Sequence, residues 1–517
     1  KPRKIISCII NILLLILSIV NYFMNSYFHS IFSWKDLFLS GDGFSFLGSI
    51  LKFVNLKLIL FVLTAVDIIL LIFKTRTKKV YQIKSKQTII LIGIILLIIG
   101  GRIIFINTKL NNTSDGWDSR EVSNNSSNYY KNWIEPTKLL RICGTYEYII
   151  NDFYHSFLEK DNSVNARENV TKYIEENKKE VNDKNYTGIF KDKNLIFVMM
   201  ESMDDWMVNE ETTPTMYEMM NHGFNFTNHY SPGYVTGETA NTEFVANTGM
   251  YPSINKLSPN YAYIDNDYPY SIANLFKKEG YITNSFHRSS GFIYNRENMH
   301  LSLGYNKYHS YLYLDLDSYI IRDGYNQIVQ LNDKFMSFII TYSPHSPYTY
   351  EKIECTTNLD DIKEIYPDIT NEEYLCGFSA ARETDNMFKL LLDNLLEDTV
   401  IVAFSDHPNK IIIRDDETEK LNKTKFFIYS SEMDSNQIDV VTSSINILPT
   451  IVNLFGIDND YLYTGYDALN TNEEYVIFRD YTYYDGTDIK PLTSELLNKV
   501  EYSSNILISN YYKGLKN

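Results

Sequence analysis

The sequence predicts an α/β domain with a central, mainly parallel sheet, preceded by an apolar helical region. From about residue 192, short apolar runs alternate with amphipathic stretches, which is the pattern of strands joined by crossover helices. Three longer apolar runs lie within the first 106 residues. We therefore expect a transmembrane region at 1–106, a polar linker with juxtamembrane helices at 107–190, and an external domain at 191–517.

The three apolar runs, 5–24, 56–73 and 88–106, are each about long enough to cross the hydrocarbon core of a bilayer. Asp67 lies near the middle of the second run and costs about 2.5–3.5 kcal/mol on insertion scales, whereas each Leu, Ile, Phe or Val returns about 0.3–0.6 kcal/mol. The many apolar residues outweigh this cost. Asp67 could face a water-filled bundle interior or a helix–helix contact.

Clusters of basic residues predict the orientation of these spans. Lys and Arg are enriched on the cytoplasmic side of membrane proteins. Such residues precede the first run and separate the second from the third, so everything after 106 is expected outside the cell: Lys1, Arg3, Lys4, Lys74, Arg76, Lys78, Lys79, Lys84 and Lys86. The sequence thus predicts a multi-pass protein of the cell membrane. The net charge of -16 argues against a nucleic-acid partner, and nothing in the sequence predicts the oligomeric state.

The segment after the third run changes from a linker to helices and then to strands. Residues 107–128 are polar and rich in Asn and Ser, whereas "PTKLLRICGTYEYIINDFYHSFL" and "ENVTKYIEENKKEV" have helical periodicity. The runs "NLIFVMM", "YITNSFH", "FMSFIITYS", "TVIVAFS" and "KFFIYS" predict strands, and "SIANLFKKEG" and "AARETDNMFKLLLDNLLED" predict helices between them. Sites in such sheets lie at the carboxyl ends of the strands.

The four cysteines are too few for a disulfide scaffold. Cys8 lies in the first apolar run and Cys143 in a juxtamembrane helix. Cys355 and Cys376 lie 21 residues apart in the external part, where an oxidising compartment permits a disulfide between them. None of the four has the spacing of a metal site or of a catalytic thiol.

Two predicted strands run directly into metal-type ligands. Glu201 follows "NLIFVMM", and Asp406 and His407 follow "TVIVAFS". With Thr239 they form a hard, oxygen-rich set that suits Mn²⁺ or Mg²⁺ and can also accept Zn²⁺. Thr239 lies where a helix should begin, in "GYVTGETANTEF", so the local sequence supports a helix cap with Glu243 as well as a metal-activated nucleophile.

Five blocks carry a resemblance to a known family: "MMESMDDW", "TGETANTEF", "SFHRSSGFIYNRENM", "SPHSPY" and "FSDHP". Their order and approximate spacing resemble the lipoteichoic acid synthase family, which are membrane-anchored phosphoglycerol transferases with a sulfatase-like, alkaline-phosphatase-type fold. The resemblance extends to "SSINILPTIVNLFGID" near the C-terminus and covers most of the external domain.

The resemblance implies roles for particular residues. Thr239 would be the nucleophile and would ligate a metal ion, preferably Mn²⁺, together with Glu201, Asp406 and His407. A glycerol-phosphate group would pass from phosphatidylglycerol through a covalent threonine intermediate to a glycerol-phosphate polymer or glycolipid. The substrate site would be lined by His287, Tyr294, Arg296 and His345.

Several positions depart from the family pattern. Glu238 stands beside Thr239 where relatives commonly have Lys, and Ser289 replaces an acid. Tyr294 stands for a usual Trp, the Asp-His pair lacks a following Tyr-Gly, and three apolar runs are visible where the family usually has five. Two other readings therefore stay open: a phosphoethanolamine transferase or related phosphodiester hydrolase of the same superfamily, and a non-catalytic external binding protein.

Overall fold

The computed structural model describes residues 2–28, 31–34, 37, 54–74, 136–158, 163–177, 184–232, 238–252, 259–409, 422–478 and 482–514, with isolated positions between 90 and 104. The chain divides into two compact units, Lys1–Glu159 and Lys160–Asn517. The predicted third apolar run, 88–106, lies largely outside the described residues, and the polar linker at 107–128 lies wholly outside them.

The first unit is helical. It contains α1 (Pro2–Phe28), α4 (Leu56–Lys74), α7 (Pro136–Phe153) and the π-helical turn η3 (Tyr154–Leu158). Helices α1 and α4 cover the first two predicted runs. No helix among the described residues combines the length and apolar character needed to cross a membrane.

An eight-stranded sheet forms the centre of the second unit. Its order is β10-β2-β9-β7-β1-β6-β4-β5. Strands β7, β1, β6, β4 and β5 are mutually parallel, and β9 joins β7 in the antiparallel sense. The strand bounds are β1 (Asn194–Met200), β2 (Gly223–Phe226), β4 (Ile282–His287), β5 (Lys307–Ser310), β6 (Phe335–Ile340), β7 (Thr399–Ser405), β9 (Phe426–Tyr429) and β10 (Ser435–Ile438).

The mainly parallel sheet expected from the sequence is thus confirmed, and β1 and β7 have the predicted bounds. Both are buried along nearly their whole length, which explains why each appears in the sequence as a continuous apolar run rather than an alternating one. Two small sheets complete the strands: β3 (His229–Tyr230) with β8 (Lys423–Thr424), and β11 (Val476–Ile477), β12 (Thr482–Tyr484) and β13 (Ile489–Pro491).

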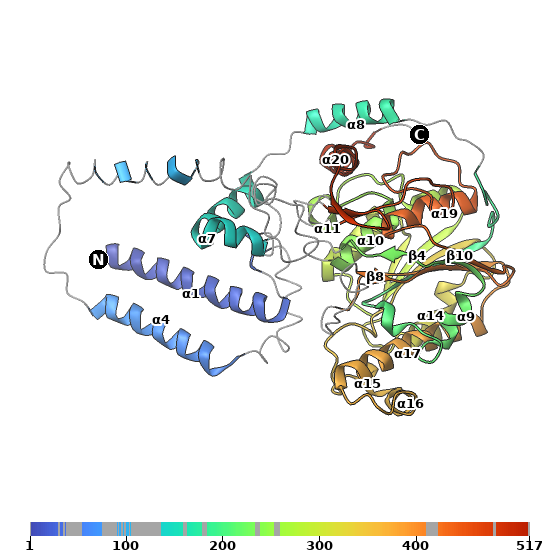
Figure 1. The fold of residues 1–517 in the computed structure, drawn as a ribbon, viewed down its shortest axis with the longest axis horizontal. Helices are drawn as coiled ribbons and strands as arrows, with labels where there is room; N and C mark the ends of the chain where they lie inside the picture. The colour runs from blue at the N-terminus through green and yellow to red at the C-terminus, as the bar shows by residue number, and fades with distance from the viewer. Residues whose placement is uncertain are drawn as a thin grey trace. The chain divides into compact units, whose positions relative to one another are not determined.

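Helices cover both faces of the sheet (Figure 1). Alternate residues of β1 contribute to two separate cores: Leu195, Phe197 and Met199 to one, and Ile196, Val198 and Met200 to the other. The first core includes residues from α8 (Ser163–Asn177), α10 (Glu238–Thr248), α12 (Ile272–Lys278), α13 (Arg296–Ser302), α19 (Ile447–Phe455) and α20 (Ser494–Ser509), and α11 (Pro259–Ala262) lies beside α10. The second includes residues from α9 (Pro214–Met219), α14 (Ser318–Ile328), α15 (Ile353–Thr356) and α17 (Glu372–Asp393), with α16 (Leu359–Ile365) packed on α17.

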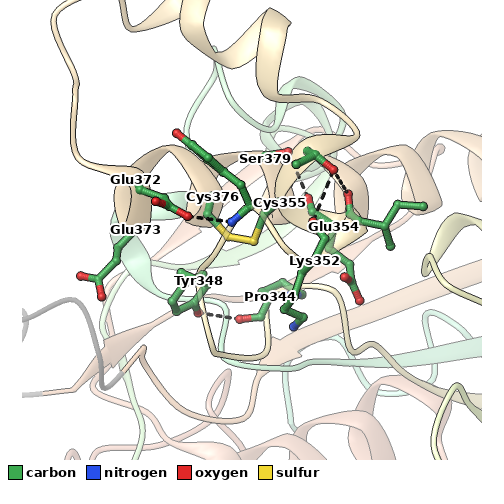
Figure 2. Close-up of a disulfide and its surroundings, with 12 residues drawn as sticks. Pro344, Tyr348, Lys352, Glu354, Cys355, Glu372, Glu373, Cys376 and Ser379 are labelled. Carbon is green, nitrogen blue, oxygen red and sulfur yellow. Dashed lines mark hydrogen bonds between the residues drawn. A yellow bond between two sulfur atoms is a disulfide. The ribbon is translucent and has the colours of Figure 1, made fainter. Parts of the chain in front are cut away.

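Cys355 and Cys376 form a disulfide that joins α15 to α17, as the sequence predicts (Figure 2). Both side chains are buried. Nearby, the hydroxyl of Ser379 donates a hydrogen bond to the backbone oxygen of Glu354 at 3.0 Å. The disulfide therefore secures the chain that leads from β6 to the helices of the second core.

Removal of this disulfide should destabilise the second unit. Closing a loop of this length restricts the unfolded chain, and the effect on the free energy of unfolding is about 3 kcal/mol. Denaturant titration of a Cys355→Ser/Cys376→Ser double variant should show a loss of this size, and reductant should give the same loss in the parent. Cys143→Ser, which removes a free thiol of the first unit, is the control. Equal midpoints for parent and double variant would contradict the prediction.

Candidate active site

Four neighbouring parallel strands end at one edge of the sheet and supply the site. Because β7, β1, β6 and β4 are adjacent and parallel, the residues that follow them must meet at that edge. Asp406 and His407 follow β7, Glu201 follows β1, and His345 lies in the segment after β6. His287 is the last residue of β4.

Glu201, Asp406 and His407 converge on one point. One ligand atom from each lies within 4.8 Å of the others. The Nε2 atom of His407 is 3.4 Å from Oε1 of Glu201 and 3.4 Å from Oδ2 of Asp406. Glu201 and Asp406 are buried, and the side chain of His407 is 12% exposed. The short distances show that the structure brings these three predicted ligands together.

Thr239 completes this cluster. It lies in the first turn of α10, and its Oγ1 atom is 3.4 Å from Oε2 of Glu201 and 3.3 Å from Nε2 of His407. The amino terminus of a helix favours an anion, because its first N–H groups lack partners within the helix. The hydroxyl therefore sits between metal-type ligands and a position suited to a phosphate. The preceding residues, 233–237, lie outside the described part of the chain.

Backbone and hydroxyl groups orient the two carboxylates. The N–H groups of Ser202 and His407 donate to Oδ1 of Asp406 at 2.8 and 2.7 Å. The hydroxyl of Ser202 donates to Oε1 of Glu201 at 3.0 Å, and the N–H of Glu201 donates to Oγ1 of Thr341 at 2.9 Å. Ser202 adopts a positive φ of 50° to make these contacts. Nothing in the sequence indicates these roles of Ser202 and Thr341, because neither belongs to a residue type diagnostic of a metal site.

The electrostatics of the cluster favour added positive charge. Burial, followed by the charge of Glu201, raises the pKa of Asp406 to about 8. Burial opposes ionisation of Glu201, but its hydrogen bond with His407 and the neighbouring imidazoles hold its pKa well below the usual range. Burial would lower the pKa of His407, yet the two carboxylates raise it to about 10. The two buried carboxylates therefore compete for the charge available from a single imidazole.

One carboxylate oxygen indicates that the cluster is suited to a cation. Oδ2 of Asp406 is buried and accepts no hydrogen bond from the described residues. A buried carboxylate oxygen is costly without a partner. Two carboxylates, an imidazole and a hydroxyl fit a divalent cation, and the predominance of oxygen suits Mn²⁺ or Mg²⁺, with Zn²⁺ also acceptable.

His287 and His345 both pack against one aromatic ring, that of Tyr342. The Tyr342 ring is stacked on His345 at 4.9 Å and meets His287 edge-on at 6.0 Å. The Nδ1 atom of His287 contacts the backbone oxygen of Ile340 at 2.8 Å. Burial lowers the pKa of both imidazoles and so favours the neutral form of each ring. The two histidines are among the substrate-site residues that the family resemblance implies, whereas Tyr342 is not.

Arg296 is buried and its Nε–H is engaged by Glu243. It donates to both carboxylate oxygens of Glu243, at 3.1 and 2.7 Å. Burial opposes its ionisation, but Glu243 keeps its pKa above the ordinary value. Its guanidinium lies 5.5 Å from the ring of Tyr294, whose backbone adopts a left-handed φ of 56°.

Glu243, which the sequence allows as a capping partner of Thr239, instead pairs with Arg296 in the structure. Its spacing of four from Thr239 is compatible with a capping pair, but its carboxylate instead reaches Arg296, with Nε2 of His300 3.7 Å away. No local pattern in the sequence indicates this pair, because Glu243 and Arg296 are 53 residues apart. Helix α10 thus carries both Thr239 and the partner of Arg296.

Loss of Glu243 should destabilise the protein strongly. Glu243→Ala leaves the Arg296 guanidinium buried without its counter-charge, and such a loss costs about 3–5 kcal/mol. The measurement is the free energy of unfolding by denaturant titration. Replacing both partners, as Glu243→Leu/Arg296→Met, should recover most of it. The control is Asp192→Asn, which removes the charge of an exposed partner of Lys334 and keeps a residue type that tolerates the left-handed φ of 65° at this position. It should have little effect. Equal losses for Glu243→Ala and Asp192→Asn would contradict the assignment.

Comparison with known proteins identifies the fold and the family. The sulfatase family model matches residues 193–457. Lipoteichoic acid synthase from Staphylococcus aureus (strain USA300) is 23% identical over 444 residues, covering 73% of this chain and 67% of that protein. The crystal structure of a lipoteichoic acid synthase from Listeria monocytogenes superposes with a TM-score of 0.54 at 22% identity, covering 68% of this chain and 98% of that chain.

A second solved structure has the same architecture. A protein of the alkaline phosphatase superfamily from Vibrio parahaemolyticus superposes with a TM-score of 0.51 at 18% identity, covering 69% of this chain and 99% of that chain. These likenesses support the alkaline-phosphatase-type α/β fold that the motif blocks imply. The matched region runs from just before β1 through α19 and contains Glu201, Thr239, Asp406 and His407. The chain therefore belongs to the sulfatase family of enzymes.

Proposed function

We propose that this protein is a membrane-anchored, divalent-cation-dependent phosphoglycerol transferase. Its donor is phosphatidylglycerol, and its acceptor is a glycerol-phosphate polymer or glycolipid of the cell envelope. The observation that carries the proposal is the hydroxyl of Thr239, within 3.4 Å of Glu201 and 3.3 Å of His407 at the start of a helix. Similarity to proteins named lipoteichoic acid synthase supports the choice of donor.

The reaction is two displacements at phosphorus. Oγ1 of Thr239 attacks the donor phosphorus, the bond from phosphorus to the diacylglycerol oxygen breaks, and the hydroxyl proton ends on the released diacylglycerol. An acceptor hydroxyl then displaces Thr239, and its proton returns to the threonine oxygen. A divalent cation, held by Glu201, Asp406, His407 and Thr239, would lower the pKa of the hydroxyl and offset charge on the phosphoryl oxygens.

The surrounding side chains would position the substrate. The amino terminus of α10 favours the phosphate. The imidazoles of His287 and His345 both pack against Tyr342. Nδ1 of His287 donates to the backbone oxygen of Ile340 and Nδ1 of His345 to that of Ser346. In the neutral ring this leaves Nε2 to accept a hydrogen bond, for which a glycerol hydroxyl is a suitable donor. Arg296 contributes a positive charge whose orientation Glu243 fixes, and Tyr294 lies over that charge. These groups would hold the phosphorus in line with Thr239.

The apolar runs at 5–24, 56–73 and 88–106 are the basis for placing the protein in the cell membrane. In this arrangement residues 191–517 lie outside the cell, and 107–190 connect them to the spans. A tethered enzyme meets a lipid donor at a high effective concentration. The same tether would serve a phosphoethanolamine donor, so donor identity must be decided by experiment.

Thr239→Ala should abolish transfer. The chain is incubated with Mn²⁺ and phosphatidylglycerol labelled in its acyl chains, and release of labelled diacylglycerol is measured. Release should fall to background because the attacking oxygen is gone, whereas Thr239→Ser retains an oxygen and should keep part of the activity. Mass spectrometry of the peptide containing residue 239 should find glycerol phosphate on the parent and none on Thr239→Ala. Undiminished release by Thr239→Ala would exclude Thr239 as nucleophile, and labelled phosphatidylethanolamine as the better donor would favour ethanolamine phosphate.

Metal content should depend on the two carboxylates. The purified parent should hold a divalent metal ion in stoichiometric amount, measured by elemental analysis, and Glu201→Gln and Asp406→Asn should each lose most of it because the ligand charge is halved. The control is Asp323→Asn, which alters an exposed acid of α14 that is paired with Arg322. A metal-free parent, or unchanged metal in both variants, would favour a non-catalytic binding protein.

A further inference from the structure

Four large apolar side chains are exposed at the edge of the sheet that carries the site. They are Phe292, Leu312, Tyr313 and Ile353, with 70%, 65%, 70% and 43% of their surfaces accessible. Single exposed residues of this kind are common, but an exposed group beside a functional site marks an interaction surface. We call these four residues the apolar rim.

A buried arginine holds together the three segments that carry the rim. Arg288 donates through its Nε to Asp317 at 3.1 Å, through one terminal nitrogen to the backbone oxygen of Leu314 at 3.2 Å, and through the other to Glu354 at 2.8 Å. Phe292 lies four residues after Arg288. Leu312 and Tyr313 directly precede Leu314, and Ile353 directly precedes Glu354. Arg288 thus links the three chain segments that carry the rim residues, although these segments come from distant parts of the sequence.

The rim adjoins the substrate histidines. Arg288 directly follows His287, and the N–H of Tyr311 donates to the backbone oxygen of His287 at 2.9 Å. The Arg288 guanidinium also lies 5.2 Å from the ring of Tyr342, which contacts both His287 and His345. From Ile353 the chain passes through Glu354 to the disulfide of Cys355, which secures this side of the rim (Figure 2).

We propose that the apolar rim docks on the lipid bilayer and receives the acyl chains of the donor. This inference rests on the proposed function. When the phosphorus of a phospholipid reaches Thr239, its two acyl chains are only a few covalent bonds away and must leave the polar site across its mouth. Phe, Tyr and Leu are residues that enter the membrane interface favourably. A lipid surface therefore matches both the chemistry and the place of the rim.

The first experiment compares donors that differ only in chain length. The full chain, in detergent-free proteoliposomes, receives either bilayer phosphatidylglycerol or a short-chain phosphatidylglycerol that is soluble as a monomer. The variant Phe292→Ser/Leu312→Ser/Tyr313→Ser should lower the ratio of bilayer to soluble turnover by at least roughly tenfold, because three side chains lose their transfer into lipid. Leu331→Ser is the matched control, since Leu331 is 71% exposed but precedes β6, at the opposite edge of the sheet. An unchanged ratio in the triple variant would overturn the proposal.

A second readout does not depend on activity. A tryptophan is introduced by Phe292→Trp or, as the control, by Leu331→Trp. Each variant is placed in vesicles of phosphatidylglycerol with brominated acyl chains, which quench tryptophan fluorescence. The fluorescence signal of the parent chain is subtracted. Quenching of the tryptophan at 292 and none at 331 is expected. Absence of quenching at 292 would overturn the proposal, as would a triple variant that changes from oligomer to monomer in light scattering, because the rim would then be covered by a second copy.

The proposed transferase activity and the proposed lipid contact of the rim can fail separately. Quenching at 292 in a chain that turns over neither donor would leave the rim as a lipid surface and reject the transferase. Turnover of both donors with a normal ratio and no quenching would support the transferase and reject the rim.

Discussion

The side-by-side burial of Glu201 and Asp406 is the constraint on which the rest of the site depends. The β1–β7 register pairs Met200 with Ser405, so the next residue on each strand is one of the two carboxylates. Like charges at this separation in a buried place are unfavourable. The N–H groups of Ser202 and His407, the hydroxyl of Ser202 and the imidazole of His407 reduce that cost. Within the part of the chain that the structure describes, Oδ2 of Asp406 is left without a hydrogen bond, and a bound cation would stabilise it. Thr239 lies close enough to the same groups for that cation to lower the pKa of its hydroxyl.

Sequence reasoning succeeded where a pattern reflects one local cause. Strands β1 and β7 are buried along nearly their whole length, so their apolar runs mark both their bounds and the polar residues that follow them. The disulfide between Cys355 and Cys376 could also be predicted, because these are the only two cysteines in the sequence of the expected external domain, 191–517. The motif blocks, rather than periodicity, led to the sulfatase-type fold and to Thr239. The membrane spans and the residue roles remain predictions.

Contacts between distant segments were beyond sequence reasoning. Glu243 has local spacing that suits a cap, and only the fold brings Arg296 to it, 53 residues along the chain. Arg288 gave no signal at all, because a lone arginine in a loop is usually solvated, yet it binds two carboxylates and a carbonyl in the interior. Tyr342 could not be identified for a similar reason. It contacts the imidazoles of His287 and His345, and the fold rather than its neighbours in sequence creates these contacts.

Helix α10 has an unusual consequence for how this protein can evolve. From Thr239 to Thr248 every side chain is buried, although six of the ten are polar. Each polar group must find its partner inside the protein: Thr242 donates to the backbone oxygen of Asp406, and Asn247 accepts from Tyr305. A single exchange in this helix would orphan a group elsewhere, so tolerated changes must come in pairs. New substrate preferences should therefore arise through changes in the exposed loops around the site, while the helix that carries Thr239 stays unchanged.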